Sequence, residues 1–434
     1  MSKIKIVILF LIVTFSVNAQ FTIDYNDLQF KVAVYSPSDE IFSWWGHAAL
    51  VVEYTRWNYE RVFDWGINSH PNESFIADFI DGLVEYKVIS SIHYIGGYIE
   101  EDRDIVIYTL DIDNSSKEKM LSYMENRVLP ENCYYEYHEF LDNCSTGVRD
   151  VINLGTNGQF MEAFSSIPGR FTYRQHVQRY TWFRPFADWL MGFLMGQNLD
   201  EEISVWEEMF LPVEIARNIV DFKYIDNSGM ERNLVSSVQI INSSRNRHPI
   251  LHKPLVTWPF FLAAGLFIMT LLFLIKSIQK KYPRFGRIFY NLIQCILGLL
   301  FGLCGCVLTI GLFMDTEYIR DNINILFINP LILIIVPLGI LAAVNVNIKI
   351  KSALLLRIVW TYIFITAAFT LFIRILPDFF QQNQAVCAFV LHVTFALGIF
   401  PSLLARHLHP PLLWLREIFI CRLCSEKQER RNPD

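Results

Sequence analysis

Five long apolar stretches in the second half of the chain restrict its possible folds more than any other feature of the sequence. Inside a bilayer every backbone polar group must be bonded within the protein, so a spanning segment is a helix or part of a closed barrel. Each stretch is close to the roughly 20 residues that a helix needs to cross the hydrocarbon core. They predict an all-α membrane domain over residues 251–405 with five transmembrane helices, at Pro254–Ile275, Ile288–Met314, Ile325–Val344, Ala353–Leu376 and Ala385–Leu404.

The charges in the loops between these stretches predict an orientation. The second and fourth loops contain Asp315, Glu317, Asp321 and Asp378, with Arg320 as their only basic residue, while Arg374 lies at the end of the fourth stretch. Basic residues concentrate instead in the other loops and the tail, at Lys276, Lys280, Lys281, Arg284, Arg287, Lys349, Lys351, Arg406, Arg416, Arg422, Lys427, Arg430 and Arg431. By the positive-inside rule, the tail, 406–434, lies in the cytoplasm and the first 250 residues lie outside it.

The first residues, MSKIKIVILFLIVTFSVNAQ, independently predict export. Lys3 and Lys5 precede a short apolar run, and Val17 and Ala19 supply the small residues of a cleavage site. We expect a signal peptide over 1–19, cut after Ala19, although a retained first membrane helix is the alternative. No cysteine follows the site directly, so the protein is not expected to be a lipoprotein itself.

Residues 20–250 are mixed in polarity and long enough to bury a core of their own. The net charge of the chain is −6, which argues against nucleic-acid binding. No glycine-rich phosphate loop and no repeat of fixed period is present in the sequence. In the tail, Pro410–Cys424 predicts an interfacial helix, and its single Cys421-x-x-Cys424 pair is more often incidental than a redox or zinc site.

The exported segment predicts an α+β domain. Alternating patterns rich in β-forming residues predict strands at 47–54, 61–66, 104–110 and 133–140. The segment 117–129 predicts a helix that ends at Pro130, and 73–86 predicts a shorter one.

Cys144, in the stretch FLDNCSTGVRD, is the candidate for chemistry. Asn143 is a good N-cap, and Val148, Val151 and Ile152 recur at helical spacing, which places the thiol at a helix N-terminus. The partial positive charge there favours the thiolate. A buried filler and a disulfide to Cys133 are the alternatives. If 133–140 is extended, however, the two α-carbons stand roughly 25 Å or more apart, which is too far to bridge.

A cysteine nucleophile requires a nearby base, and His47 is the first candidate. It opens the strand 47–54 directly after Gly46, although a lone histidine in such a place is more often structural. Asp64 would orient the imidazole, but strict hairpin pairing places it opposite about residue 51. The expected contact therefore needs a bulge or shear, unless the two residues meet on adjacent strand ends. Rival histidines are His70, His93, His138 and His176, of which His138 is the strongest because it is near Cys144 in sequence.

The order of a histidine, a polar residue and a cysteine at a helix start resembles circularly permuted papain-like domains, such as lecithin:retinol acyltransferase and relatives of the NlpC-type peptidases. The segments WGHAAL, FDWG, YEYHEFLDNCSTGVRD and EEMFLP more closely resemble the Lnb family of bacterial lipoprotein N-acyltransferases. The resemblance covers most of the exported domain and continues weakly at NINILFINP, 322–330. Asp64 stands where that family often has asparagine, and DTE at 315–317 stands where a histidine-bearing stretch is expected.

The resemblance implies a circularly permuted papain-like fold with Cys144 as nucleophile, His47 as base and Asp64 as orienting residue. It implies a phospholipid as acyl donor and the α-amine of a diacylated lipoprotein as acceptor, with no metal or organic cofactor. The protein would lie in the bacterial inner membrane among membrane lipids, with its catalytic domain, 20–250, in the periplasm.

Two other classes of function compete with this interpretation. One is a membrane-anchored periplasmic cysteine hydrolase or amidase that acts on cell-wall or peptide substrates, and the other is a receptor without catalysis. The aromatic residues Trp44, Trp45, Tyr135 and Tyr137 are equally compatible with a substrate site and with ordinary core packing.

Overall fold

The computed structural model describes residues 23–69, 84–244, 248–314, 316–344 and 349–401. The signal peptide, the tail with its interfacial helix and CxxC pair, and His70 lie outside the described residues. The chain forms two compact units. The first contains the described residues up to Gly169 together with Ser204–His248, and the second contains Arg170–Ile203 and the described residues from Pro249 onward.

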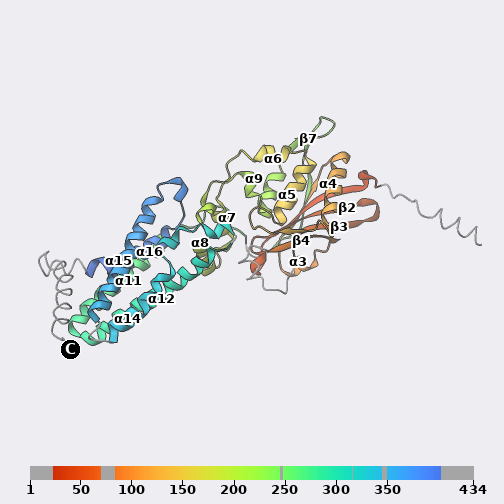
Figure 1. Cartoon of the computed structure of the whole chain (residues 1–434). Helices are drawn as coiled ribbons and strands as arrows, with labels where there is room; N and C mark the ends of the chain where they lie inside the picture. The colour runs from red at the N-terminus through yellow and green to blue at the C-terminus, as the bar shows by residue number, and fades with distance from the viewer. Residues whose placement is uncertain (1–22, 70–83, 245–247, 315, 345–348, 402–434) are drawn as a thin grey trace, which may run out of the picture. The chain divides into compact units, whose positions relative to one another are not determined.

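The first unit is built on a seven-stranded antiparallel sheet of order β6-β4-β3-β2-β1-β5-β9 (Figure 1). The strands are β1 (Leu28–Tyr35), β2 (His47–Tyr54), β3 (Tyr59–Asn68), β4 (Glu85–Ile92), β5 (Ile105–Leu110), β6 (Tyr134–Glu136) and β9 (Val235–Asn242). A separate hairpin pairs β7 (Lys223–Ile225) with β8 (Glu231–Asn233). The α+β prediction is therefore confirmed.

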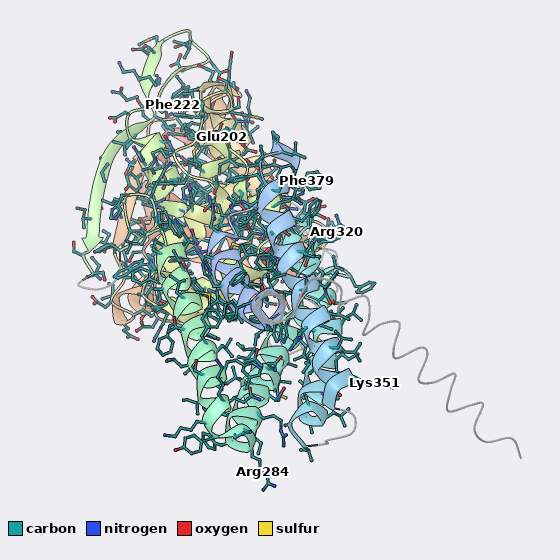
Figure 2. All side chains as sticks on the ribbon, turned by 90° about the vertical axis from the view of Figure 1, so that its left-hand side faces the viewer. Glu202, Phe222, Arg284, Arg320, Lys351 and Phe379 are labelled. Atoms are coloured by element: carbon teal, nitrogen blue, oxygen red, sulfur yellow. The ribbon has the colours of Figure 1, made fainter. Side chains whose placement is uncertain are left out.

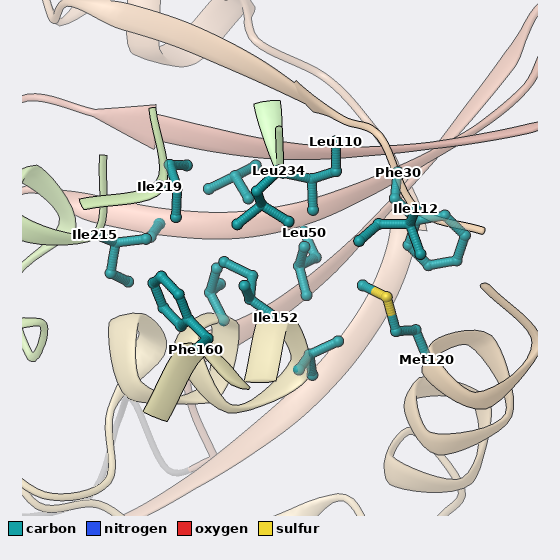
Figure 3. Packing of buried hydrophobic residues seen from close by; sticks show 14 of the residues in the cluster. Phe30, Leu50, Leu110, Ile112, Met120, Ile152, Phe160, Ile215, Ile219 and Leu234 are labelled. Carbon is teal, nitrogen blue, oxygen red and sulfur yellow. The ribbon is translucent and has the colours of Figure 1, made fainter. Parts of the chain in front are cut away.

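Helices cover the two faces of this sheet unequally. The larger core lies on one face, where Phe30, Leu50 and Leu110 meet Ile152 and Met120 (Figure 3). The opposite face buries Ala33, Tyr35 and Ile107 beneath α3 (Gly96–Glu100). The helices on the larger core are α4 (Asn114–Arg127), α5 (Cys144–Gly155), α6 (Gln159–Phe164), α9 (Val205–Glu208) and α10 (Pro212–Ile219).

Several local predictions differ from the structure. The strand predicted at 133–140 is only three residues long, because β6 pairs with Glu85–Lys87 and the chain then turns through a bridge between His138 and Asp142. The helix predicted at 73–86 lies mostly outside the described residues, and its last two residues belong to β4. Strand β1 was not predicted from the sequence. It is a central strand whose two faces are both covered, so its alternation is blurred at the adjacent buried residues Val32 and Ala33.

The second unit is helical, and its long members are strongly apolar. Trp258–Lys281 (α11), Pro283–Gly311 (α12) and Lys351–Ile373, within α15 (Lys349–Ile373), are each long and apolar enough to cross a membrane. A fourth span results if Glu317–Leu326 and Pro330–Val344 are counted together across a bend of 44°. The second part of that bent pair contains α14 (Ile335–Val344). Figure 2 shows Arg284 and Lys351 towards one end of these helices and Phe379 towards the other.

The predicted number of five spans is not confirmed. The last apolar stretch forms the shorter helix Gln384–Ile399, which begins as α16 (Gln384–Thr394). At about 1.5 Å per residue, the described part of this helix is shorter than the roughly 30 Å hydrocarbon core. Its continuation beyond residue 401 lies outside the described residues. The second unit also contains α7 (Tyr173–Thr181) and α8 (Pro185–Leu194), which the sequence analysis assigned to the exported segment.

Candidate active site

Cys144 is the first residue of α5, as its sequence context predicts. The Oδ1 atom of Asn143 accepts hydrogen bonds from the backbone N–H groups of Ser145 at 2.8 Å and Thr146 at 3.0 Å. Thr146 completes a capping box, because its hydroxyl oxygen accepts the Asn143 N–H at 2.7 Å. The backbone N–H of Cys144 is not among the groups that this cap occupies. The thiol therefore stands at the positive end of the helix beside an available amide.

The further hydrogen bonds of Asn143 explain why an asparagine caps this helix. Its Nδ2 group donates to the carbonyl oxygen of Glu139 at 2.7 Å and to that of Phe210 at 3.2 Å. One buried side chain thus joins the helix start, the preceding turn and the EEMFLP segment, 207–212. An aspartate would cap the helix but has no donor for these carbonyl groups, and a serine or threonine has only one donor, on a shorter side chain.

His47 and Asp64 are brought together by the pairing of β2 with β3. The observed pairing ends with Leu50 opposite Phe63, and its continuation would set Asp64 opposite Ala49 rather than residue 51. His47 then reaches Asp64 diagonally on the same face of the sheet, and its Nε2 atom lies 3.0 Å from the Asp64 Oδ2 atom. His47 and Asp64 thus meet beyond the last paired residues of β2 and β3, which is the strand-end arrangement expected as an alternative to a bulge or shear. The irregularity at Asp64 lies instead on the β4 side of β3.

Gly66 makes room for this arrangement. Continuing the register places Gly66 opposite His47, and a Cβ atom there would lie 2.6 Å from the imidazole Cε1 atom. Its N–H also donates to the Asp64 Oδ1 atom at 2.7 Å, which fixes the second carboxylate oxygen. The FDWG segment therefore contributes both the orienting carboxylate and the space for the base.

His47 and Cys144 form an electrostatic pair. Burial opposes a charged imidazole, but the charges of Asp64 and Cys144 raise the pKa of His47 well above its ordinary value. Burial alone would raise the pKa of the Cys144 thiol, yet the charge and hydrogen bond of His47, with the backbone N–H of Ala48, lower it. With Nε2 bound to Asp64, Nδ1 is the imidazole nitrogen left for the thiol. The arrangement favours a thiolate–imidazolium pair.

Asp64 supports that pair as a carboxylate. Burial works against its charge, but the charge and hydrogen bond of His47, together with the Gly66 N–H, hold the pKa of Asp64 below its ordinary value. Asp64 is 8 % exposed and Cys144 is partly exposed. The orienting group is thus shielded from water, whereas the cysteine residue keeps part of its surface exposed.

Aromatic rings that the sequence analysis did not assign to the site pack behind His47. The rings of Tyr35 and Tyr98 stack with centroids 3.9 Å apart, and the His47 ring lies 5.8 Å from that of Tyr35. The guanidinium group of buried Arg103 lies 5.0 Å from the Tyr98 ring centroid. Tyr35 faces His47 across the β1–β2 pair, a contact that only the register reveals.

The four aromatic residues considered from sequence divide into two pairs. Burial and the negative charge of Cys144 raise the pKa of both Tyr135 and Tyr137, so their hydroxyl groups stay protonated near the sulfur. Trp44 and Trp45 pack together ahead of His47, with ring centroids 6.1 Å apart, and Trp44 is buried. The tyrosines therefore border the site, and the tryptophans support the segment that leads into it.

The described rival histidines have other partners. His93 contacts the Tyr35 hydroxyl at 3.0 Å and Glu60 at 2.8 Å. The Nδ1 atom of His138 accepts the backbone N–H groups of the turn that follows it, at 3.2 and 3.1 Å. His176 is fully buried beside Arg179 in the second unit. Among the described residues, His47 is thus the histidine that the fold pairs with Cys144.

The structure contains no disulfide bond between Cys133 and Cys144. Cys133 and Cys144 are both free thiols, and the Cys133 sulfur lies 3.7 Å from the Pro130 carbonyl oxygen. Within the described part of the chain, no group of three histidine, cysteine or acidic residues is arranged to hold a metal ion.

The fold and site define a membrane protein with an exported α+β domain that presents a cysteine, a histidine and an aspartate together. Residues 16–180 match the family model of the Lnb N-terminal periplasmic domain, and this range includes all three residues. The match supports a Lnb-type protein with its first domain in the periplasm. No curated protein and no solved structure gives a significant match to the chain. The permuted papain-like topology therefore stays a prediction.

Proposed function

We propose that the protein is a lipoprotein N-acyltransferase of the bacterial inner membrane. The observation that carries the proposal is the pairing of a helix-start thiol, Cys144, with a histidine that a buried carboxylate orients. Such a thiolate is a good nucleophile for two-step acyl transfer. The match to the Lnb periplasmic domain and the apolar helices support a reaction between membrane-bound substrates.

In the first step the Cys144 thiolate attacks the ester carbonyl carbon of a phospholipid, and the carbonyl oxygen becomes an oxyanion. The Cys144 backbone N–H, which the helix cap leaves available, is the proposed donor to that oxyanion. The intermediate then collapses, and the carbon–oxygen bond to the glycerol breaks. Imidazolium His47 gives its proton to the leaving alkoxide, so the products are a lysophospholipid and an acyl thioester.

In the second step the α-amine of a diacylglyceryl-cysteine lipoprotein attacks the thioester carbonyl carbon. Neutral His47 takes a proton from the incoming amine, and the carbon–sulfur bond breaks to release the thiolate and an amide. Asp64 stabilises the imidazolium that forms again at this point. The cycle needs no cofactor, because the acyl group stays at the same oxidation level throughout.

The test is mass spectrometry of lipoprotein N-terminal peptides from a host that lacks its own N-acyltransferase. Cells that express the protein should yield peptides heavier by one acyl chain, and Cys144→Ala should abolish this product. Cys133→Ala is the matched control, because Cys133 is also a free thiol of the same domain. Diacyl peptides alone, with well-expressed wild-type protein, would contradict the proposal and favour the hydrolase alternative.

A further inference from the structure

Four buried amide side chains form a connected cluster in the helical unit. The Asn322 Oδ1 atom accepts from Gln381 Nε2 at 3.2 Å, and Asn324 Oδ1 accepts from Asn383 Nδ2 at 3.0 Å. Asn322 and Gln381 also donate to the Met195 carbonyl oxygen, at 3.2 and 3.1 Å. All four side chains are at most 4 % exposed. The cluster lies between the bent helix pair and the loop that joins α15 to α16.

Two polar atoms beside this cluster have no partner. Asn383 Oδ1 and Arg374 Nε are buried, and neither makes a hydrogen bond within the described structure. Both residues lie near the first turn of α16, for which Asn383 is the N-cap residue. The Cys387 N–H donates to the Asn383 carbonyl oxygen at 3.0 Å, and the charge of Arg374 acts on Cys387. Arg374 Nε is a hydrogen-bond donor on a cation, and Asn383 Oδ1 is an acceptor.

The nearby carboxylate does not satisfy Arg374. Asp200 is the acidic residue whose charge reaches the guanidinium group, but Arg174 binds both of its oxygens, at 2.7 and 3.0 Å. The backbone N–H of Gln382 also donates a hydrogen bond to the Asp200 carboxylate, at 2.9 Å. Arg374 lies instead against an aromatic ring, 5.2 Å from the centroid of Phe380.

The Arg374 Nε–H, just past the end of a membrane helix, can donate to an anion from outside the protein. A buried donor without a partner is costly, and ionisable residues of membrane segments mark ligand sites by default. Arginine suits phosphate oxygens in particular. The loop charges assign this end of α15 to the outer side of the membrane, where a basic residue is otherwise unusual.

We propose that Arg374 and Asn383 bind the headgroup of a phospholipid, with Arg374 on the phosphodiester and Asn383 Oδ1 accepting from a headgroup hydroxyl or ammonium. That this lipid is also the acyl donor rests on the proposed function, whereas the binding site itself does not.

Binding is tested on the full-length protein with Cys144→Ala, which prevents turnover. Native mass spectrometry in detergent measures the apparent affinity for dioleoyl phosphatidylglycerol. Dioleoylglycerol has the same acyl chains without phosphate, and sodium phosphate is offered as a competitor. We expect Arg374→Gln to weaken phosphatidylglycerol binding about tenfold, the scale of one charge-assisted hydrogen bond, and to leave dioleoylglycerol binding unchanged.

Arg357→Gln is the matched control, because Arg357 lies on α15, the helix that ends directly before Arg374, and is also half-buried. It should bind phosphatidylglycerol as the parent protein does. Asn383→Leu should remove the preference for phosphatidylglycerol over phosphatidylcholine, whose headgroup has no donor. Arg374→Lys retains the positive charge but lacks the planar guanidinium group, so it should bind phosphatidylglycerol with intermediate affinity.

The site would be overturned if the Arg374→Gln protein bound phosphatidylglycerol with unchanged affinity and unfolded at the same temperature as the parent protein. Full competition by inorganic phosphate at equal concentration would overturn the lipid assignment and indicate a site for soluble phosphate. A failure of the acyl-transfer experiment leaves these measurements intact, because they use a protein without the nucleophile.

Discussion

At the scale of single residues, the state of Cys144 depends on His47. The pKa of the thiol is lowered, so the thiolate is present above that lowered pKa and is lost as pH falls through it. The pKa of His47 is raised, so the imidazolium persists until pH rises through the raised value. The ion pair therefore exists at pH values between the pKa of Cys144, which lies below the ordinary thiol value of 9.0, and the raised pKa of His47.

This predicts the pH profile of Cys144 alkylation by iodoacetamide. In the wild-type protein the rate should already be high near neutral pH. In His47→Gln it should rise only as pH approaches the ordinary thiol range, because the charge that lowers the pKa is gone. Mass spectrometry of the Cys144 peptide gives the rate, and buried Cys133 in the same sample is the internal control. Superimposable profiles for the two proteins would rule out the ion pair.

Gly66 provides a second test at the residue scale. In Gly66→Ala the added methyl group would lie 2.6 Å from the His47 ring, so the imidazole must move away from Asp64 or Cys144. We expect acyl transfer to fall about 10²-fold, as for other displacements of about 1 Å at a catalytic centre. Gly97→Ala is the matched control, since no heavy atom lies within 4 Å of its added Cβ. Equal transfer by both variants would contradict the proposed packing of Gly66 on the base.

At the scale of elements, α5 is the part that positions the nucleophile, and Asn143 is its cap. Asn143→Asp should retain the cap through its carboxylate but lose the donations to Glu139 and Phe210. Its negative charge next to the sulfur should also raise the pKa of Cys144. We therefore expect slower alkylation at neutral pH, measured as above.

The control at this scale is Asp113→Ala, which removes the side-chain cap of α4. It should destabilise the protein by about 1 kcal/mol, the usual effect of a lost cap, without a change in Cys144 alkylation. Thermal unfolding measures the first effect. If Asp113→Ala slowed alkylation as much as Asn143→Asp, the reactivity of Cys144 would reflect general stability rather than the local cap.

At the scale of the whole molecule, the distribution of charge predicts the topology. Single cysteines at Ser228, in the β7–β8 turn, and at Arg284, in the first turn of α12, are introduced into a protein without other cysteines. A membrane-impermeant maleimide should label the Ser228→Cys protein in spheroplasts. It should label the Arg284→Cys protein only after the membrane is opened. Labelling of Arg284→Cys in sealed spheroplasts would reverse the predicted orientation.

Features set by neighbouring residues could be predicted from the sequence alone. The start of α5 at Cys144 follows from the cap at Asn143 and the apolar spacing after it, and β2 has the predicted bounds His47–Tyr54. The apolar character of the second half is likewise a matter of composition, and it predicts membrane helices without any knowledge of the fold.

Only the tertiary structure decided which distant residues meet. The choice of His47 over His138, and its diagonal contact with Asp64, depend on a strand register that periodicity does not encode. The grouping of Arg170–Ile203 with the helices depends on Asn322 and Gln381, more than a hundred residues away, which bond to the backbone of that segment. Local patterns specify helices, strands and caps because their hydrogen bonds lie within a few residues. A site assembled from three segments depends on how the whole core packs.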